Sequence, residues 1–500
     1  MSGAPGHIAI LGGGTAGWMA ACLMAQRWGR LGTRVTVIES PEIGIIGVGE
    51  GSTPHLKHFF DTVGLGEADW MSAADATYKA GIGFHGWSDA PGFDSYFHPF
   101  PTELDPETAP DFFAATRARR RGAPVEAHPD RYFLPTRLAA ERRAPIAPDS
   151  YGHRIGYGYH FDAHKVGATL RTHATSRLGV VHREARIAEV VVRDGAVGHL
   201  VTGTGERIAA DLFVDASGFR SVIHQQALAV PFQSYADALF NDAAVVLPTP
   251  LGPHGPDVQT RAVALSAGWA WAIPLTTRVG NGYVYSSRHL DRDAAEAELR
   301  AHLGVGDEIP ARHLAMRVGR VEASWHANSL AIGLAQGFLE PLEATALHIV
   351  QSTIEGFVQA WEDGAFTPRH RDVFNRTIAA RYDGIRDYIV CHYRVNQRRD
   401  TPYWRDAAQV PVSDSLARLL DCWFTGGDLT AEIEAQGIGR YYAPLSWHCL
   451  LGGYGVYPDP ARMRTREAAP EHDPMPRIDA FIAREAAKFP AHAEALARLR

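Results

Sequence analysis

The stretch His7-Ile-Ala-Ile-Leu-Gly12-Gly-Gly-Thr-Ala-Gly17 decides the fold class of this 500-residue chain. Its first five residues form an apolar run typical of a buried strand, and the glycines after it match the spacing G-x-G-x-x-G. The first glycine of this pattern permits a tight turn, and the second lets the backbone approach a pyrophosphate. The third lets helix and strand pack closely. The stretch therefore predicts the phosphate-binding turn of a dinucleotide-binding fold.

The residues on the C-terminal side of this turn support the same prediction. Residues 18–29 form an alanine-rich helical pattern, and residues 34–38 form a second apolar strand that ends at Glu39. A helix N-terminus attracts phosphates, and an acid about 20 residues further on binds ribose hydroxyls. An ordinary strand-to-helix turn is the alternative interpretation. The predicted cofactor-binding residues here are Gly12, Gly14, Thr15, Ala16, Gly17 and Glu39.

A second motif favours FAD over NAD as the cofactor. Asp215-Ala-Ser-Gly218 closes a late strand, as in the second flavin-contacting motif of glutathione-reductase-like flavoproteins. Outside this turn, no G-x-G-x-x-G stands between a strand pattern and a helix pattern, where it could hold a nicotinamide. We therefore expect an α/β protein with an FAD-binding, glutathione-reductase-like fold of Rossmann type. A β-sheet substrate region and a mainly helical C-terminal part complete the expected fold.

Composition and patterning indicate how the chain is organised. The hydrophobic fraction of 46% and the formal net charge of -7 exclude global disorder and argue against a dedicated nucleic-acid binder. We expect an FAD-binding, monooxygenase-like module over residues 1–345, with an insertion at about 90–150. A helical part that covers the substrate is expected over 346–500. Asp194-Gly195 predicts a hairpin turn, and short strands are expected over 230–290.

Targeting signals and cysteine spacings in a sequence indicate the cellular compartment of a protein. The sequence shows no signal peptide and no apolar run of membrane-spanning length, which predicts a cytoplasmic protein without membrane contact. The four cysteines have no C-x-x-C spacing, so we expect buried thiols and no metal site. These cysteines are Cys22, Cys391, Cys422 and Cys449.

Lysine is rare in this chain. Of 49 basic residues, four are lysines, namely Lys57, Lys79, Lys165 and Lys488. A coding bias towards arginine explains the count. Where arginine serves equally well, however, a lysine that remains is a candidate for amine chemistry, because guanidinium cannot readily lose its proton.

Several further motifs together resemble the flavin-dependent tryptophan halogenases, over nearly the whole chain. Trp269-Ala-Trp-Ala-Ile-Pro274 matches the W-x-W-x-I-P signature of that family, and Lys79 lies in a matching Thr-Tyr-Lys-Ala-Gly. The other matches are residues 12–18, Gly47-Val-Gly-Glu50-Gly-Ser-Thr-Pro54 and Phe338-Leu-Glu-Pro-Leu-Glu343-Ala-Thr345.

The resemblance implies a two-component halogenase. Reduced FAD, supplied by a separate NAD(P)H-dependent flavin reductase, and O2 oxidise bromide or chloride to hypohalous acid. Lys79 then directs this acid onto an electron-rich, indole-like aromatic substrate, with Glu343 as the neighbouring carboxylate. An ammonium donor in a site that excludes water suits this role, because hypohalous acid is a poor electrophile without a hydrogen bond to its oxygen.

The remaining site residues are also carried over from the resemblance. Thr345 and Ala346 would bind halide through their backbone N–H groups, and Trp269 and Trp271 would shield the flavin. Core packing is the alternative for both tryptophans and for Phe100, a helix cap for Glu343 and a surface position for Lys79. The predicted substrate-binding residues are His98, Phe100 and Trp447, and the further cofactor-binding residues are Gly49, Glu50, Ile187, Gly218, Leu334 and Leu347.

Three departures from the family pattern concern the substrate and the halide. Ala344 replaces the usual serine after the glutamate, and Ala346 replaces a glycine of the halide loop. The segment that clasps the amino acid after a Tyr-Tyr pair is absent, since Tyr441-Tyr442 leads directly into Ala-Pro-Leu-Ser-Trp447. We therefore expect free tryptophan to bind poorly and indole-like or larger indole-bearing molecules to be accepted.

Two other functions remain open at this point, an FAD-dependent aromatic hydroxylase and a non-catalytic flavin-binding relative. The first needs neither halide nor Lys79, so a halide-dependence assay separates it from a halogenase. The sequence leaves open the native substrate, the ring position attacked, the choice of halide, a homodimer, and whether residues 101–150 are ordered.

Overall fold

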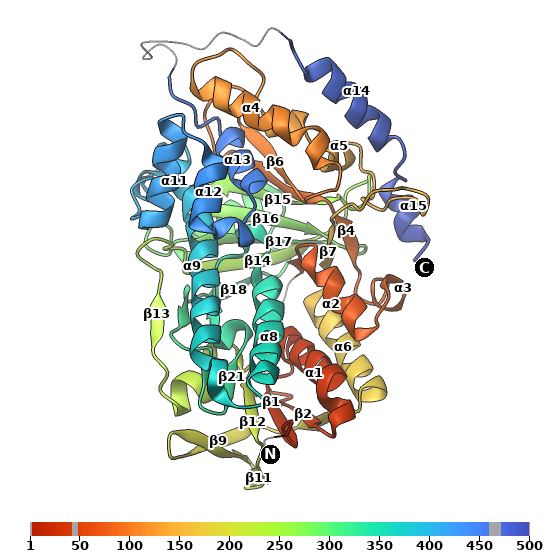
Figure 1. Cartoon of the computed structure of the whole chain (residues 1–500), viewed down its shortest axis with the longest axis vertical. Coiled ribbons are helices and arrows are strands. Elements are labelled where there is room, and N and C mark those ends of the chain that lie inside the picture. The colour runs from red at the N-terminus through yellow and green to blue at the C-terminus, as the bar shows by residue number, and fades with distance from the viewer. Residues whose placement is uncertain (1–2, 43–48, 460–471, 500) are drawn as a thin grey trace. The chain divides into compact units, whose positions relative to one another are not determined.

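The computed structural model describes residues 3–42, 49–459 and 472–499 (Figure 1). Contacts divide the chain into two compact units, each assembled from three stretches. Unit 1 comprises Met1–Ala76, Phe161–Ala236 and Met316–Asp383, and unit 2 comprises Thr77–His160, Asp237–Ala315 and Gly384–Arg500. This division differs from the expected boundary at residue 345, because strands far apart in sequence pair with each other within both units.

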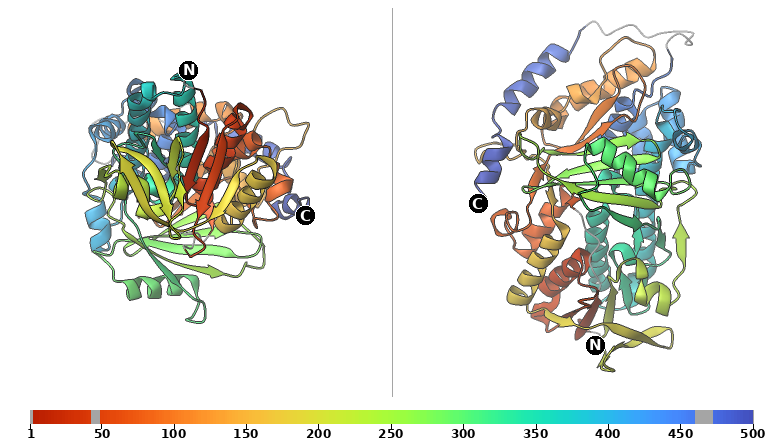
Figure 2. Two further views of the ribbon diagram at one scale, coloured as in Figure 1. Left: turned by 90° about the horizontal axis from the view of Figure 1, so that it is seen from below. Right: turned by 180° about the vertical axis from the view of Figure 1, so that it is seen from behind.

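Unit 1 is built on a six-stranded sheet in the order β20-β21-β12-β1-β2-β8. Strands β1, β2, β8, β12 and β21 run parallel, and β1 and β2 are buried along almost their whole length. Buried parallel strands are typical of sheets with helices on their faces. Helix α1 packs beside α6 and α8, and the left view of Figure 2 shows β1 and β2 side by side.

The elements of unit 1 follow the predicted order of strand, glycine turn, helix and strand. Their bounds are β1 His7–Leu11, α1 Thr15–Trp28, β2 Arg34–Glu39, β3 Glu50–Gly51, α2 His55–Val63, α3 Glu67–Trp70, α6 Ala163–Arg177, β8 Val181–Glu184, β9 Ile187–Arg193, β10 Ala196–Thr202, β11 Arg207–Ile208, β12 Leu212–Asp215, β13 Phe232–Ser234, β19 Gly319–Val321, β20 Trp325–His326, β21 Ser329–Ala331, β22 Gly337–Phe338 and α8 Ala346–Asp363. Helix α9, Arg371–Val395, continues from unit 1 into unit 2.

The predicted hairpin is confirmed. Strands β9 and β10 pair antiparallel, and the turn residues Asp194 and Gly195 have φ values of 49° and 74°. Two successive positive φ angles are the signature of a type I′ turn, whose twist matches that of the flanking strands.

Unit 2 contains a seven-stranded sheet in the order β18-β14-β17-β16-β15-β5-β6. All neighbours pair antiparallel except β15 and β5, which run parallel. Helix α7 covers one face through Ala295 and Leu299, which pack on Val245 and Tyr283 (Figure 2, right). The bounds are β4 Thr77–Lys79, β5 Gly81–His85, β6 Ser95–Pro99, α4 Ala109–Arg120, α5 Leu134–Ala140, β7 Gly158–Phe161, β14 Ala243–Thr249, β15 Gln259–Leu265, β16 Gly268–Pro274, β17 Val279–Tyr285, α7 Arg292–Leu303, β18 Arg312–Ala315, α10 Pro402–Ala407, α11 Asp414–Phe424, α12 Leu429–Gln436, α13 Pro444–Gly453, α14 Met475–Ala486 and α15 His492–Ala497.

The expected insertion at 90–150 forms part of the core of unit 2. Phe112 of α4 and Phe133 pack against Ile478 of α14, and Leu138 of α5 packs near Phe489. Figure 1 shows α4 in orange beside α14 in blue, although more than half of the sequence separates them. These buried contacts make helices α4 and α5 part of the core of unit 2.

The expected fold class is confirmed. The strands of the described residues lie between residues 7 and 338, in parallel, mixed and antiparallel sheets, and helices dominate after residue 346. Within the described ranges, none of the helices combines the length and the apolar character needed to cross a bilayer. The four cysteines are free thiols in the structure.

Candidate active site

The glycine turn of unit 1 is built by close backbone approaches. Gly12 has a φ of 118°, and a Cβ there would lie 2.2 Å from the carbonyl oxygen of Ala216. A Cβ on Gly17 would lie 2.0 Å from the carbonyl oxygen of Gly12. Glycine is therefore required at both positions, and the end of β1 is held against Ala216 of the second motif.

The first turn of α1 leaves its N–H groups for a ligand. Gly14 is the N-cap and offers no side-chain cap, and no heavy atom lies within 4 Å of the position a Cβ would take. The hydroxyl of Thr15 donates to the carbonyl of Ala163, so Thr15 can offer a ligand its backbone N–H. This arrangement matches a phosphate cradle at a helix N-terminus.

Glu39 lies beside this cradle, at the end of β2. A Cβ on Gly13 would come within 2.3 Å of the Glu39 carboxylate, so the glycine makes room for the acid. His182 lies 3.1 Å from Oε2 of Glu39, a contact that the sequence did not predict. The acid is thus held at the strand end where a ribose would lie.

The third stretch of unit 1 reaches the same turn. Gly333 has a φ of 59°, and a Cβ there would lie 2.9 Å from the Cβ of Ala16 and 4.0 Å from Val350 of α8. Leu334 follows in the short helix of Gly333–Ala335. The structure therefore brings Ala16, Leu334 and the N-terminal half of α8 together.

The acid of the G-E-G-S-T-P motif is half-buried, and its carboxyl points away from solvent. Gly49 has a φ of 117° and precedes Glu50, whose Oε2 is buried and has no hydrogen-bond partner among the described residues. Burial, with a contribution from the charge of Asp162, raises the pKa of Glu50 to about 7. An unsatisfied buried carboxyl indicates a missing polar partner. Gly47 of the same motif lies outside the described residues.

The second flavin motif is held rigidly by Asp215. Its buried carboxylate accepts hydrogen bonds from the backbone N–H groups of Ser217, Ile223 and His224. Gly218 then adopts a φ of 71° with open space around its Cβ position. Asp215 therefore fixes the conformation of the turn, and the space beside Gly218 stays open.

The predicted cofactor residues all belong to unit 1, and their surroundings are compatible with FAD. The N-terminus of α1, the acid at the end of β2, the Glu50 carboxyl and the open turn at Gly218 are the kinds of group that a dinucleotide site uses. Ile187, by contrast, packs against a hydrophobic cluster that includes Leu200 and Phe213. The unit 1 set is Gly12, Gly14, Thr15, Ala16, Gly17, Glu39, Gly49, Glu50, Ile187, Gly218, Leu334 and Leu347.

The predicted halide residues stand at the start of α8. Thr345 is the N-cap and is buried, and Ala346 is the first helical residue and is exposed. The first N–H groups of the helix have no intrahelical acceptor, which suits an anion. Ala344 has a φ of 55°, a left-handed conformation, and Glu343 just before it is buried.

Lys79 is fully buried at the end of β4 in unit 2. Its Nζ lies 5.4 Å from the centre of the Phe100 ring, within the range of a cation–π contact. The N–H of Phe100 donates to the carbonyl of Ala80, so the backbone next to Lys79 fixes the position of this ring. The structure thus brings together the predicted catalytic lysine and a predicted substrate residue.

Further aromatic residues of unit 2 form a cluster with His98. The Nε2 atom of His98 lies 3.0 Å from the hydroxyl of Ser446, and its ring centre lies 6.0 Å from that of Tyr388. Tyr388 stacks on Tyr442 at 3.6 Å and meets the edge of Trp447 at 4.8 Å.

Two members of this cluster, Tyr388 and Ser446, were not predicted from the sequence. Tyr388 lies on a long helix whose pattern looks like core packing, so no motif marks it. Trp447 is buried, and its Nε1 has no hydrogen-bond partner within the described residues.

Trp269 and Trp271 lie on one face of β16, with ring centres 6.0 Å apart. A Cβ on Gly282 would lie 2.1 Å from the Trp271 ring, so glycine on β17 makes room for it. The Nε1 of Trp271 is buried without a hydrogen-bond partner in the described part of the chain. Shielding of the flavin by this pair stays a prediction, because the tryptophans belong to unit 2 and the cofactor residues to unit 1.

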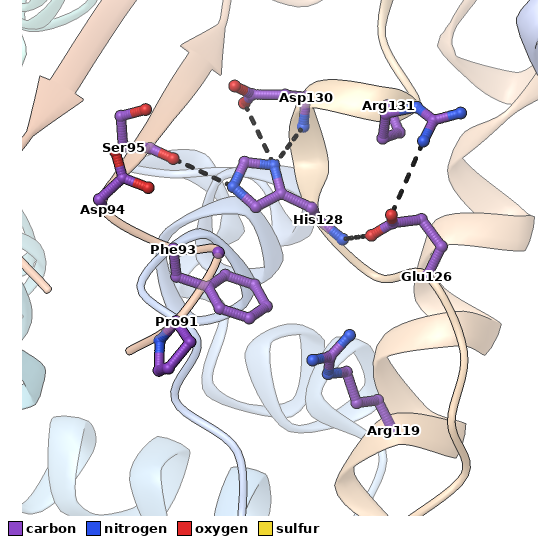
Figure 3. A pocket seen from close by; sticks show the side chains of 10 residues that line it. Pro91, Phe93, Asp94, Ser95, Arg119, Glu126, His128, Asp130 and Arg131 are labelled. Carbon is purple, nitrogen blue, oxygen red and sulfur yellow. Dashed lines mark hydrogen bonds and ion pairs between the residues drawn. The ribbon is translucent and has the colours of Figure 1, made fainter. Parts of the chain in front are cut away.

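A different cavity of unit 2, of about 430 Å³, lies elsewhere (Figure 3). His128 occupies its centre, with Nε2 at 3.0 Å from the Ser95 carbonyl and Nδ1 at 3.7 Å from Asp130. Arg131 pairs with Glu126 at 3.7 Å. The polar side chains that line this cavity form hydrogen bonds and ion pairs with their neighbours. No predicted catalytic or substrate-binding residue lines it.

Comparison with known proteins decides the family. A family model described as tryptophan halogenase matches residues 7–470. The chain belongs to the tryptophan halogenase family. This halogenase is similar to the 7-chloro-L-tryptophan 6-halogenase KtzR of Kutzneria sp. (strain 744), with 37% identity over 99% of both chains. It is also 34% identical to the tryptophan 7-halogenase RebH of Lentzea aerocolonigenes, over 92% of this chain and 91% of the relative.

Solved structures agree with the sequence comparison. Xcc4156, a flavin-dependent halogenase from Xanthomonas campestris, superposes with a TM-score of 0.85 at 33% identity, over 99% of this chain and 98% of the other. The protein is a flavin-dependent halogenase, which implies FAD, O2 and a halide, and the hydroxylase and non-catalytic alternatives are not favoured. Within the described residues, no group of three His, Cys, Asp or Glu side chains is arranged to hold a metal ion.

Proposed function

We propose that this halogenase transfers bromide or chloride, oxidised to hypohalous acid, onto an electron-rich aromatic ring of indole type, with Lys79 as the directing residue. Bound as FADH2 from a separate NAD(P)H-dependent flavin reductase, the cofactor supplies the oxidation of halide by O2. The observation that supports the role of Lys79 is its complete burial beside the Phe100 ring.

Lys79 acts on the oxygen of hypohalous acid. Its ammonium donates a hydrogen bond to that oxygen, which weakens the oxygen–halogen bond as the aromatic carbon attacks the halogen. The proton passes to the leaving oxygen, and water is released. The attacked carbon then loses its own proton, which returns to the amine of Lys79 and restores the ammonium. Burial strengthens this interaction, because a fixed charge acts more strongly where water is excluded.

Phe100, His98 and Trp447 are proposed to hold the aromatic substrate. Phe100 is fixed beside Lys79 by its backbone bond to Ala80, and Trp447 belongs to the aromatic cluster of unit 2. Aromatic faces hold an electron-rich ring by stacking while one edge stays open to attack.

Glu343 and the start of α8 complete the proposal. Glu343 is proposed to orient the ammonium and to stabilise the positive charge that develops on the attacked ring. The backbone N–H groups of Thr345 and Ala346 are proposed to bind the halide. Both roles rest on the family resemblance, supported by the burial of Glu343 and by the helix N-terminus at Ala346.

The decisive experiment replaces Lys79 by alanine. With reductase, FAD, NADH, O2 and bromide, Lys79→Ala is expected to form hypohalous acid normally, as measured with a chemical trap. Ring halogenation is expected to fall by at least about 100-fold, the scale of a lost proton donor. Product masses measure both reactions.

Lys488→Ala is the matched control, because Lys488 is an exposed lysine of the same unit that pairs with Glu485. It is expected to behave like the wild-type enzyme. Normal ring halogenation by Lys79→Ala contradicts the role of the lysine, and hydroxylation without halide contradicts the proposed function itself.

For the substrate, we propose indole-like compounds or larger indole-bearing molecules in place of free tryptophan. In the structure, Ala443 alone separates Tyr442 from the start of α13, which leaves no room in the chain for a clasp at this point. Calorimetry is expected to show weaker binding of free tryptophan than of indoles without the zwitterion. Micromolar binding of free tryptophan would contradict the proposal.

A further inference from the structure

We infer that His160 is a positioning residue for Lys79, because two threonine hydroxyls hold its imidazole as one neutral tautomer beside the lysine. This inference rests on the proposed role of Lys79. It assigns a task to a buried histidine that lies outside the directing and substrate-binding residues.

The strand pairing places His160 near Lys79. Strands β4 and β7 pair antiparallel, with Thr77 opposite His160 and Lys79 opposite Gly158. Side chains two residues apart on a strand lie on the same face, so Thr77, Lys79 and His160 share one face of this pair. His160 and Lys79 are both fully buried.

The hydrogen bonds fix the tautomer of His160. The hydroxyl of Thr77 donates its proton to the carbonyl of Pro274 at 2.7 Å, and the same oxygen lies 3.0 Å from Nδ1 of His160. With its proton already used, the Thr77 oxygen accepts, so Nδ1 carries hydrogen. Nε2, at 3.0 Å from the hydroxyl of Thr260, then accepts from that hydroxyl. Both ring nitrogens are satisfied in the neutral form.

The electrostatics agree with this assignment. Burial, with smaller contributions from Lys79 and His492, holds the pKa of His160 well below its ordinary value. A second positive charge in the same buried face would repel the Lys79 ammonium. A neutral imidazole therefore adds no repelling charge beside Lys79.

A second histidine, His492, binds the backbone of β4 next to Lys79. Its Nε2 accepts from the backbone N–H of Tyr78 at 3.3 Å, and its Nδ1 donates to the carbonyl of Pro256 at 3.2 Å. Burial lowers the pKa of His492 to about 4, opposed by Asp257 and assisted by Arg142. The strand that carries Lys79 is thus flanked by two imidazoles that stay neutral.

The test removes one hydroxyl and follows both reactions. Thr260→Val leaves the Nε2 lone pair without its donor, so the imidazole is no longer held in one tautomer beside Lys79. We expect ring halogenation to fall by at least about tenfold, which corresponds to about 1.4 kcal/mol, the scale of one lost hydrogen bond. Hypohalous acid formation is expected to keep the wild-type rate. A purely structural role for Thr260 would lower both reactions together.

Two further variants assign the effect to His160. The double variant Thr260→Val/His160→Gln is expected to lose no more ring halogenation than His160→Gln alone, because Thr260 acts through the imidazole. The matched control is Thr116→Val, which removes a buried hydroxyl 3.0 Å from Nδ1 of another buried histidine, His448. Its rate of ring halogenation is expected to match the wild-type rate. A further loss of ring halogenation in the double variant beyond that of His160→Gln, or an equal loss in Thr116→Val, overturns the inference.

A direct measurement separates this inference from the proposed function. Ring ¹⁵N signals assigned to His160 by difference from His160→Gln are expected to show a neutral Nδ1–H tautomer from pH 5 to 8. An imidazolium or an Nε2–H tautomer in that range overturns the inference whatever the activity. Failure of the wild-type enzyme to halogenate any indole overturns the proposed function and leaves this spectrum unchanged.

Discussion

At the scale of single residues, the four lysines divide into two kinds. Lys57, Lys165 and Lys488 are 40–46% exposed at their side chains and pair with Asp61, Asp75 and Glu485. Lys79 is fully buried. The sequence could single out Lys79 only through its motif, because rarity applies to all four lysines alike and burial depends on how distant strands pair.

The raised pKa of Glu50 predicts how the stability of the folded protein depends on pH. Its pKa of about 7 in the folded chain lies above the ordinary value of 4.5. Below pH 4.5 the carboxyl is protonated in both the folded and the unfolded state, and folding loses nothing. As the pH rises to 7 the unfolded state releases the proton first, so stability falls by about 3 kcal/mol in total. Glu50→Gln removes this dependence.

Thermal unfolding of the FAD-free protein between pH 4.5 and 8 measures the effect. Glu50→Gln is expected to unfold several degrees higher than the wild-type protein at pH 8 and at a similar temperature near pH 4.5. Glu184→Gln, which changes an exposed glutamate of the same unit, is the control and is expected to follow the wild-type curve. Parallel curves for wild type and Glu50→Gln would contradict the assignment.

At the scale of elements, the glycine turn follows directly from its sequence. The strand, turn and helix fall within a few residues of their predicted bounds, because glycine spacing and apolar runs are local signals. The start of α8 is different. Ala344 adopts a left-handed φ of 55°, which a non-glycine residue rarely does. No local sequence pattern predicts this conformation, which the surrounding structure imposes.

Two glycines of the turn, Gly14 and Gly17, predict different outcomes on substitution. Gly17→Ala places a Cβ 2.0 Å from a backbone oxygen, so it is expected to reduce both stability and FAD affinity. Gly14→Ala meets no atom within 4 Å, so stability is expected to stay near the wild-type value. FAD affinity is expected to fall by at least about tenfold, which is about 1.4 kcal/mol, because the new methyl group lies at the phosphate cradle.

Fluorescence titration and thermal unfolding of the same variants measure these two quantities. Gly29→Ala is the control, since its Cβ position is open and its backbone is in the right-handed helical region. An unchanged FAD affinity in Gly14→Ala would place the phosphates elsewhere.

At the scale of the whole molecule, the predicted residues divide cleanly between the two units. The cofactor and halide residues and Glu343 belong to unit 1, whereas Lys79, the substrate residues and both shielding tryptophans belong to unit 2. Motifs could assign these residues to a cofactor or a substrate. They could not show that the units interleave along the chain, because strand pairing between distant segments leaves no local pattern.

Hydrogen exchange tests this division. FAD is expected to slow exchange chiefly in the three stretches of unit 1, around residues 12–17, 218 and 334–347. An indole is expected to slow exchange around residues 79–100 and 446–447 of unit 2. Protection of Gly268–Pro274 by FAD is expected if Trp269 and Trp271 shield the flavin. FAD protection confined to unit 2 would contradict the cofactor assignment.

The interleaving has a consequence for synthesis on the ribosome. The chain passes from one unit to the other after residues 76, 160, 236, 315 and 383. Strand β21, which pairs with the edge of β12, emerges only when more than 320 residues have been translated. Until then the nascent sheet exposes an open edge that other chains can join. Cotranslational chaperones and slow, cool expression are therefore expected to raise the soluble yield more than any truncation, because neither unit exists as a continuous gene fragment.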